Sequence, residues 1–150
     1  MGYRSQVRIA ISKKGYKEMC NYLVDYAKRI GFNKEAILEI LKDTDINLEN
    51  KYQKYFGLDW IKWYDGYPQI DAITEALSYV EEKGYSYKFS RIGEDFTDIE
   101  EYGCDGEKDT RKNLFVDFPY LDRGFDDVAK QTQLIEQEKI LNKNKKEQER

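Results

Sequence analysis

The sequence predicts an α+β fold in which an antiparallel sheet carries helices on one face. Two observations support this prediction. Residues 3–11 alternate between polar and apolar side chains, which is typical of a strand with one buried face. Residues 13–30 repeat apolar side chains at helical spacing, which is typical of an amphipathic helix. At 150 residues the chain is long enough to form one domain with a substantial core.

The first part of the chain predicts one strand and two helices. In the strand, Tyr3, Ser5, Val7, Ile9 and Ile11 point to one face, and Arg4, Gln6, Arg8 and Ala10 point to the other. Ser12 is a suitable N-cap for the helix that follows, and Gly31 ends that helix. After the cap Asn33 we expect a second helix over residues 34–43, and then a polar loop over residues 44–51.

The aromatic segment 52–64 predicts a strand with two partly apolar faces. Phe56, Leu58, Trp60, Lys62 and Tyr64 share one face, and Tyr55, Gly57, Asp59, Ile61 and Trp63 share the other. Such a strand is either covered on both sides or exposes a tryptophan. The turn residues Asp65–Pro68 then lead into a helix that we expect over residues 67–83.

The next part of the chain predicts a β-hairpin. We expect a strand over residues 85–90, a turn at Gly93-Glu94-Asp95 and a returning strand over residues 96–101. A loop over residues 103–110 and a short strand over residues 114–118 follow.

This order of elements contains the split β-α-β arrangement of ferredoxin-like α+β folds. We therefore expect a ferredoxin-like antiparallel sheet of four or five strands, with helices 13–30 and 67–83 on one face. The strand residues expected to face these two helices are Val7, Ile9, Ile11, Tyr87 and Phe89.

Residues 126–150 differ in character from the single α+β domain expected over residues 1–125. Six acidic and six basic side chains balance each other, and apolar residues are sparse. We expect a charged C-terminal helix that runs to about Leu141, or else a frayed tail. The thin apolar stripe of such a helix would serve a second copy or another partner rather than the core; its members are Val128, Leu134, Ile135 and Leu141.

Charge is distributed unevenly along the chain. From Glu94 to Asp109, eight carboxylates and Lys108 give a net charge of −7, whereas the first 32 residues carry +5. If the fold places both regions on one surface, adjoining fields of opposite sign would orient a charged partner.

The composition argues against the common kinds of catalysis. Histidine is absent, which removes the usual general base and the commonest zinc ligand. No nucleophile paired with a base and no phosphate-binding loop is present, so we expect neither enzymatic activity nor a cofactor. Cys20 and Cys104 fall in unrelated contexts and are expected to be unpaired, as in a reducing cytosol. We expect no signal peptide and no membrane span, and hence a cytoplasmic protein.

The acidic hairpin leaves two interpretations open. Asp98 and Glu100 would share one face of the strand, which two carboxylates need in order to bind the same divalent ion. A metal-dependent hydrolase is therefore one alternative function. Arg91 would instead pair with either carboxylate across the hairpin, and a solvated edge strand that resists aggregation carries the same kind of charges.

A single-stranded nucleic-acid-binding module is the other alternative function. An aromatic and basic sheet face for this purpose would consist of Trp60, Lys62, Tyr64, Arg4 and Arg8. However, the chain lacks a Gly-Phe-x-Phe string, and its isoelectric point of about 5.1 opposes binding to phosphates.

Three strings resemble those of small uncharacterised proteins from phage and prophage accessory regions of Gram-positive bacteria. They are Met1–Val7, Trp60–Asp65 and Arg91–Glu100, and the resemblance covers roughly residues 1–102. It implies a bacterial host and a protein that binds and disables a host factor, such as a CRISPR nuclease or another immune effector, as anti-CRISPR proteins do. The resemblance assigns no catalytic residue.

Together these observations predict a non-enzymatic protein that binds a host macromolecule through a charged surface. A host protein that itself handles nucleic acid is favoured, because an acidic edge can occupy a basic groove that binds phosphates. Nucleic acid itself, and a second copy bound through the C-terminal helix, are the other partners considered. The residues expected to contact the partner are Glu94, Asp95, Asp98, Glu100, Glu101, Arg91, Trp60 and Tyr64.

Overall fold

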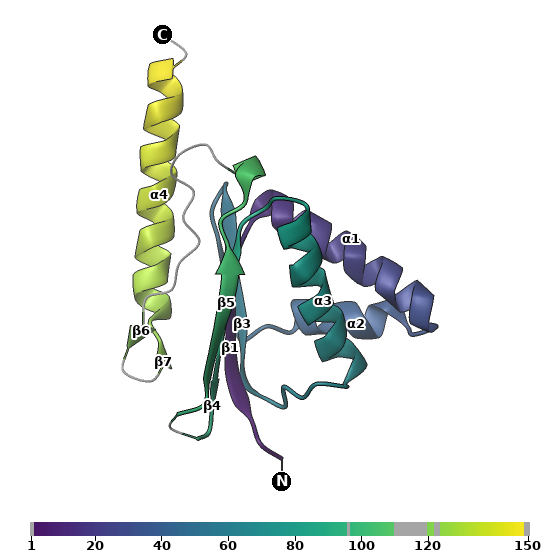
Figure 1. Ribbon diagram of the computed structural model, residues 1–150. Coiled ribbons are helices and arrows are strands. Elements are labelled where there is room, and N and C mark those ends of the chain that lie inside the picture. Colours follow the sequence, from purple (N-terminus) through teal and green to yellow (C-terminus); the bar gives the residue numbers. More distant parts are fainter. Residues whose placement is uncertain (1, 96, 110–119, 122–123, 149–150) are drawn as a thin grey trace.

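A five-stranded antiparallel sheet organises the molecule, so the fold is α+β as predicted (Figure 1). The computed structural model describes residues 2–95, 97–109, 120–121 and 124–148. The strands of the sheet are β1 (Ser5–Ser12), β2 (Ile46–Glu49), β3 (Gln53–Ile61), β4 (Tyr87–Gly93) and β5 (Ile99–Cys104). Their spatial order is β2-β3-β1-β4-β5, and every neighbouring pair is antiparallel. A short hairpin of β6 (Tyr120–Leu121) and β7 (Gly124–Phe125) forms a second sheet.

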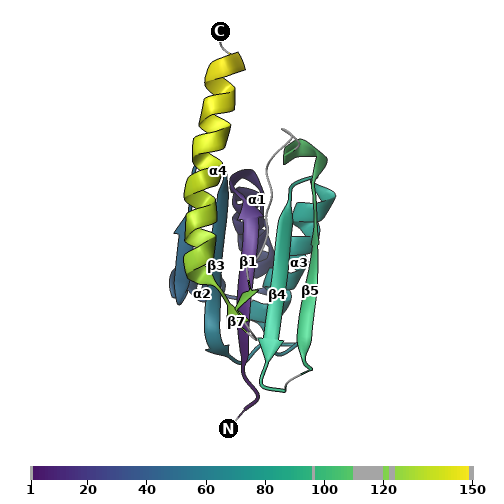
Figure 2. The same ribbon diagram turned by 90° about the vertical axis from the view of Figure 1, so that its left-hand side faces the viewer.

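Helices lie on both sides of the five-stranded sheet. Those described are α1 (Lys13–Ile30), α2 (Lys34–Lys42), α3 (Pro68–Glu82) and α4 (Asp127–Gln148), together with the short 3₁₀ helix η1 (Glu107–Asp109). α1, α2 and α3 cover one face, and α4 lies against the other (Figure 1). Figure 2 shows α4 running along the β3 and β1 side of the sheet and extending past its end.

The ends of α1 and the start of α2 lie where the sequence predicted them. The Ser12 side chain accepts a hydrogen bond from the Gly15 amide (3.1 Å), which caps the start of α1. Gly31 ends α1 with φ of 68°, a left-handed conformation that glycine adopts without strain. Asn33 Oδ1 accepts from the Glu35 amide (2.8 Å) and caps α2.

The main core lies between the sheet and the three helices α1, α2 and α3. The residues predicted to face the helices are all buried there: Val7, Ile9, Ile11, Tyr87 and Phe89. They pack against apolar side chains that include Leu23 of α1, Ile37 of α2 and Leu77 of α3. Each large side chain buried in this way stabilises the fold by about 1.5–3 kcal/mol relative to exposure.

α4 contacts the opposite face of the sheet through a small apolar cluster and several polar contacts. Leu134 is 3% exposed and packs with Ala10 and Tyr55. The Asn50 amide nitrogen donates to the Leu134 carbonyl oxygen (2.9 Å) and to Gln137 Oε1 (2.8 Å). Because so little apolar area is buried under α4, polar contacts largely determine its position.

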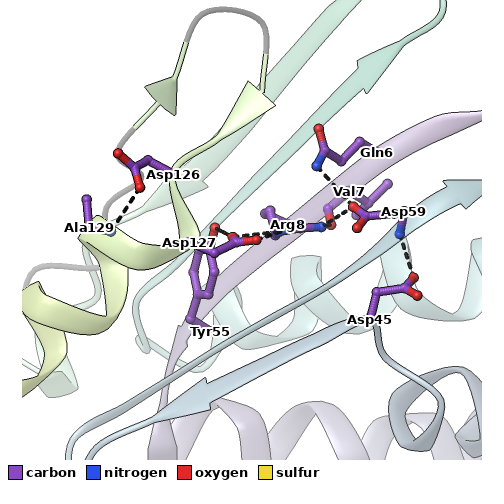
Figure 3. Close-up of polar contacts among 9 residues, drawn as sticks. All are labelled: Gln6, Val7, Arg8, Asp45, Tyr55, Asp59, Asp126, Asp127 and Ala129. Atoms are coloured by element: carbon purple, nitrogen blue, oxygen red, sulfur yellow. Dashed lines mark hydrogen bonds and ion pairs between the residues drawn. The ribbon is translucent and has the colours of Figure 1, made fainter.

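Arg8 is the charged residue that joins α4 to the sheet (Figure 3). Its side chain is 1% exposed. Nε and Nη2 donate to the two carboxylate oxygens of Asp127 at 3.1 and 3.0 Å, and Nη1 donates to Asp59 Oδ1 at 2.9 Å. The Phe125 ring lies 5.3 Å from Arg8 Cζ. Burial lowers the pKa of the guanidinium, but the hydrogen bonds to Asp127 and Asp59 outweigh this and raise it, so Arg8 stays charged.

Two residues of β3 complete the surroundings of Arg8. Tyr55 donates its hydroxyl hydrogen to Asp127 Oδ1 (2.7 Å). Gly57 pairs with Arg8 across the strands. A Cβ atom at position 57 would overlap with the Arg8 side chain and with the Val7 carbonyl oxygen. Glycine is therefore required at this position because it makes room for the guanidinium.

The loop predicted over residues 44–51 is wrong, because this segment contains β2. Ile46 and Leu48 alternate with polar neighbours and pack beside Tyr55. The segment is short and mostly polar, so its alternation over four residues indicates a strand only once β3 and α4 are known to provide apolar contacts for its two large side chains.

The returning strand of the hairpin also differs from its prediction. β5 begins at Ile99 instead of residue 96, and it continues to Cys104, within the predicted loop 103–110. The pairing of Cys104 with Tyr87 extends the strand, because β4 remains available over its whole length. The strand predicted over residues 114–118 lies outside the described residues.

β3 is covered on both faces and also exposes a tryptophan. Phe56 is buried in the main core, and Tyr55 is buried under α4. Trp63 was predicted to share the face of Tyr55, but it lies in the main core, 5.5 Å from the Phe89 ring. The alternation fails because Trp60 has a positive φ, which interrupts the regular strand.

The described part of the C-terminal helix is longer than predicted, since α4 continues past Leu141 to Gln148. Leu134 was assigned to a stripe free for a partner, and this is wrong because Leu134 is buried against the sheet. Val128 and Ile135 of the same stripe are exposed. Contact with a second copy through α4 stays a prediction.

The Arg8 contacts predict a large effect of Asp127 on stability. Asp127→Ala leaves a buried guanidinium with one of its two carboxylates, which we expect to lower the free energy of unfolding by about 3 kcal/mol. Asp126→Ala is a matched control, since Asp126 Oδ1 only accepts from the Ala129 amide (2.9 Å) at the start of α4 and its loss costs about 1 kcal/mol. Urea denaturation of both variants measures the difference, and equal losses would contradict the role given to Arg8.

Candidate functional site

The acidic segment forms the hairpin between β4 and β5, beside the start of β1. The Gly93 amide donates to the Asp98 carbonyl oxygen (2.8 Å), and the Asp98 amide donates to the Asp95 carbonyl oxygen (3.0 Å). Asp95 Oδ1 accepts from the Thr97 amide (3.1 Å) inside the turn. A Cβ atom at Gly93 would overlap with Asp98 Oδ2 and the Tyr3 hydroxyl. Glycine therefore lets the N-terminal segment approach the hairpin closely.

Arg91 pairs with both carboxylates that were predicted to share its strand face. Its Nη2 and Nη1 donate to Asp98 Oδ1 and Oδ2 at 2.8 and 3.0 Å, and Nη2 lies 3.3 Å from Glu100 Oε2. Nη1 also donates to Ser5 Oγ (3.0 Å), and Tyr3 donates its hydroxyl hydrogen to Asp98 Oδ2 (2.6 Å). The hydrogen bonds from Arg91 and then Tyr3 hold the pKa of Asp98 below its ordinary value.

This ion pair gives the hairpin carboxylates a structural role. Both oxygens of Asp98 already accept hydrogen bonds from a cation, so binding a divalent ion there would displace Arg91. Among the described residues, no group of three or more potential ligands is placed to hold a metal ion. The contacts of Asp98 therefore favour the ion-pair interpretation over the metal-site interpretation.

Trp60 is an exposed aromatic side chain on a strained backbone. Its side chain is 65% exposed, and its φ of 56° is the one positive φ found at a described residue other than glycine. Such a conformation costs of the order of 1 kcal/mol for a residue with a bulky side chain. Arg4 Nη1 donates to the Trp60 carbonyl oxygen (2.9 Å), and the Asp59 amide donates to Asp45 Oδ2 (2.7 Å), so neighbouring contacts hold this conformation.

A shallow hollow of about 450 Å³ brings Trp60 and the hairpin turn together. Its lining residues are Arg4, Gln6, Asp59, Trp60, Ile92, Gly93 and Glu94. The Arg4 amide lies 3.3 Å from Glu94 Oε2, which ties the hairpin turn to the start of β1. Asp59 Oδ1 accepts from Gln6 (3.0 Å) and from Arg8, so its carboxylate is held in place. The lining of the hollow thus combines an indole, the apolar side chain of Ile92 and charged side chains that hydrogen bonds hold in place.

The other predicted contact residues lie around this hollow or apart from it. Glu101 is exposed on β5, opposite Ser90 of β4. Tyr64 does not line the hollow, because its ring packs edge-to-face against Tyr67 near the start of α3 (5.3 Å). The structure therefore gathers the hairpin residues and Trp60 at one end of the sheet, whereas Tyr64 lies beside Gly2, outside the lining of the hollow.

The aromatic and basic face predicted for nucleic acid is not assembled as expected. Arg8 is buried beneath α4 and bound to Asp127, so its guanidinium does not reach the surface. Arg4 is exposed; its Nη1 donates to the Trp60 carbonyl oxygen, and its backbone amide lies near Glu94. For Arg8 the physical reason is that Asp59 and Asp127 occupy the donors that phosphates would need.

Two residues of the site were missed in the sequence. Tyr3 was assigned only to the buried face of its strand, and Asp59 only to a face of its strand. Their contacts join segments up to 95 residues apart, so no local pattern indicates them. Arg4 was included among the basic residues, and its contacts place the start of β1 beside Glu94 and Trp60.

In comparisons with protein-family models, curated proteins and solved structures, no significant match to this chain was found. No described helix has both the length and the apolar character needed to cross a membrane.

The lowered pKa of Asp98 predicts a pH-dependent contribution to stability. The ionised carboxylate is favoured in the folded state, so its contribution is complete above the ordinary pKa of 3.8 and disappears as the pH falls through the lower folded value. We expect Asp98→Asn to lower the melting temperature at pH 7, and this difference to shrink as the pH falls below 3.8. Thermal melts over a series of pH values from 7 downwards measure this convergence. Glu101→Gln, which removes an exposed carboxylate, should change the melting temperature little throughout; a constant gap for Asp98→Asn would contradict the assignment.

Proposed function

We propose that this protein is a non-enzymatic inhibitor that binds a host protein through the end of the sheet formed by Trp60 and the acidic hairpin. The favoured partner is a protein that handles nucleic acid and presents a basic groove, such as a nuclease of bacterial immunity. The protein would then act in the cytoplasm of a bacterial host, in the manner of an anti-CRISPR protein.

The observation that carries this proposal is the exposure of Trp60 on a strained backbone. Burying the indole in the core would have been more stable for the isolated chain by about 1.5–3 kcal/mol. The chain instead presents it beside a hollow and holds its backbone with Arg4. Tryptophan is enriched among the few residues that dominate binding energy in protein interfaces. Backbone strain of this kind concentrates at functional sites.

The charges next to Trp60 support a basic partner. Glu94, Asp95, Asp98, Glu100 and Glu101 lie on the hairpin or on β5. Arg91 neutralises part of this charge, and Arg4 adds one further cation. The excess of carboxylates would accelerate association with a lysine- and arginine-lined groove and make the affinity fall with salt.

The site favours binding over catalysis. The hydrogen bonds from Arg91 and Tyr3 hold the pKa of Asp98 below its ordinary value, so this carboxylate is ionised and unsuited to proton transfer near neutral pH. The chain contains no histidine that would act as a general base in its place.

We also propose that the fold is of the ferredoxin-like type. The order β2-β3-β1-β4, with α1 connecting β1 to the β2–β3 hairpin and α3 connecting β3 to β4, supports this assignment. β5 then adds a fifth strand, and α4 is an addition on the other face.

Replacement of Trp60 tests the proposed function. Trp60→Asn removes the indole, and asparagine tolerates a positive φ, so the backbone is preserved. We expect affinity capture from a bacterial host lysate to yield a nucleic-acid-handling protein that salt releases. With the purified partner, the variant should bind about thirtyfold more weakly, which corresponds to a loss of about 2 kcal/mol. Calorimetric titration measures this difference.

Ile30→Asn is the matched control, because Ile30 is also an exposed apolar residue (47%) but lies at the end of α1. It should leave the affinity unchanged. Equal binding by Trp60→Asn and the unmodified protein would overturn the proposed site. Tight binding of single-stranded RNA or DNA by the isolated protein at low salt would instead favour a nucleic-acid-binding module.

A further inference from the structure

β5 is the outermost strand on its side of the sheet, and its free edge is exposed. The described strands end there in the order β2-β3-β1-β4-β5, and Figure 2 shows β5 at one margin of the sheet. Ile99, Glu100, Glu101 and Gly103 are all exposed. Gly103 has no side chain, so the surface that it exposes belongs to the backbone.

The pairing with β4 establishes which backbone groups of β5 point outward. The Gly93 amide donates to the Asp98 carbonyl oxygen, and the register pairs Arg91 with Glu100. In an antiparallel ladder, alternate residues direct both N–H and C=O to the neighbouring strand. Residues 98, 100, 102 and 104 therefore face β4, whereas the N–H and C=O groups of Glu101 and Gly103 point away from it. The Ile99 N–H also points away from β4, but it donates to the Thr97 carbonyl oxygen (3.0 Å).

The edge of β5 is protected from unselective pairing by its charges rather than by its backbone. Edge strands are usually protected by charged side chains, proline, a bulge or a covering element. β5 contains neither proline nor lysine, and its register with β4 is continuous over six residue pairs. The opposite edge strand, β2, has only four residues, and it packs Ile46 and Leu48 into the cluster beneath α4.

The charges along β5 have one sign, and this selects what can pair with it. Glu100 and Glu101 point to opposite faces of the strand, and Asp105 follows its end. A second copy of β5 would place carboxylates against carboxylates, which is unfavourable. A strand carrying lysine or arginine would instead place cations beside Glu100 on one face and Glu101 on the other. Ile99, which is 53% exposed, offers an apolar contact to the same strand.

We propose that β5 accepts an extended, lysine- and arginine-containing segment of the partner protein as a sixth strand of the sheet. The added strand forms main-chain hydrogen bonds with Glu101 and Gly103, and its cations contact Glu100 and Glu101. Main-chain pairing supplies affinity in such complexes, and alternate side chains supply specificity. This inference rests on the proposed function, since it specifies how the acidic hairpin holds the partner.

A pair of variants at one position separates backbone pairing from charge. Glu101→Pro and Glu101→Gln lose the same carboxylate, but only proline loses the outward N–H. Proline is tolerated in an edge strand where its nitrogen faces solvent. The probe is a nine-residue peptide in which pairs of lysines alternate with pairs of valines, so that both faces of the added strand carry cations. The full-length protein is observed by amide NMR and by titration. We expect the peptide to slow amide exchange at Glu101 and Gly103, and Glu101→Pro to bind it about tenfold more weakly than Glu101→Gln.

A second comparison leaves the protein unchanged. The same peptide with an N-methyl group on every residue keeps its charge but can donate no main-chain hydrogen bond along either edge. It should bind at least about tenfold more weakly than the parent peptide. The same peptide with glutamate in place of lysine should not bind.

The inference is overturned if the basic peptide fails to bind at low salt, if N-methylation leaves its affinity unchanged, or if the two Glu101 variants bind equally. Amide shifts confined to Trp60 and the hollow would also overturn it. In these cases, loss of partner binding by Trp60→Asn would still support the proposed function. If affinity capture yields no partner protein, the proposed function is contradicted, whether or not the basic peptide binds to β5.

Discussion

The buried guanidinium of Arg8 is the constraint on which the rest of the structure depends. A charge held at 1% exposure in the middle strand of a sheet is tolerated only when carboxylates meet it with good geometry. Asp59 and Asp127 meet this requirement from β3 and α4. Gly57 provides the space, and Phe125 provides a ring beside the cation. One ion thus specifies the residues around it on β3 and the position at which α4 begins.

The candidate site depends on the same strand. β1 lies between β3 and β4, so its first residues reach Trp60 on one side and the hairpin on the other. Arg4 contacts both, and Tyr3 is hydrogen-bonded to Asp98. The N-terminal segment therefore gives the exposed indole and the acidic hairpin a fixed mutual arrangement. Such preorganisation reduces the entropy that a partner would lose on binding.

The parts of the fold that local patterns encode were predictable. Periodicity located α1, and alternation located the faces of β1 and β4, because each pattern reports burial against one neighbouring layer. The ion pair between Arg91 and Asp98 was also predictable from local sequence, because a hairpin brings residues that are close in sequence together. The positions of β2, Trp63 and Leu134 were not predictable, because they depend on contacts between distant segments or on the backbone of one residue. The contacts of Tyr3 with the hairpin belong to this second class.

The distance in sequence between Arg8 and Asp127, 119 residues, has a consequence for the order in which the molecule assembles. During synthesis, β1 leaves the ribosome long before the carboxylate that neutralises its central cation. The sheet and the helices α1 to α3 can form in the meantime, while the strand face around Arg8 stays hydrated. α4 then dehydrates this face. Contacts of such long range slow folding, because a large loop must close before they form. Until α4 is in place, Arg8 has Asp59 as a carboxylate partner but lacks the two hydrogen bonds to Asp127.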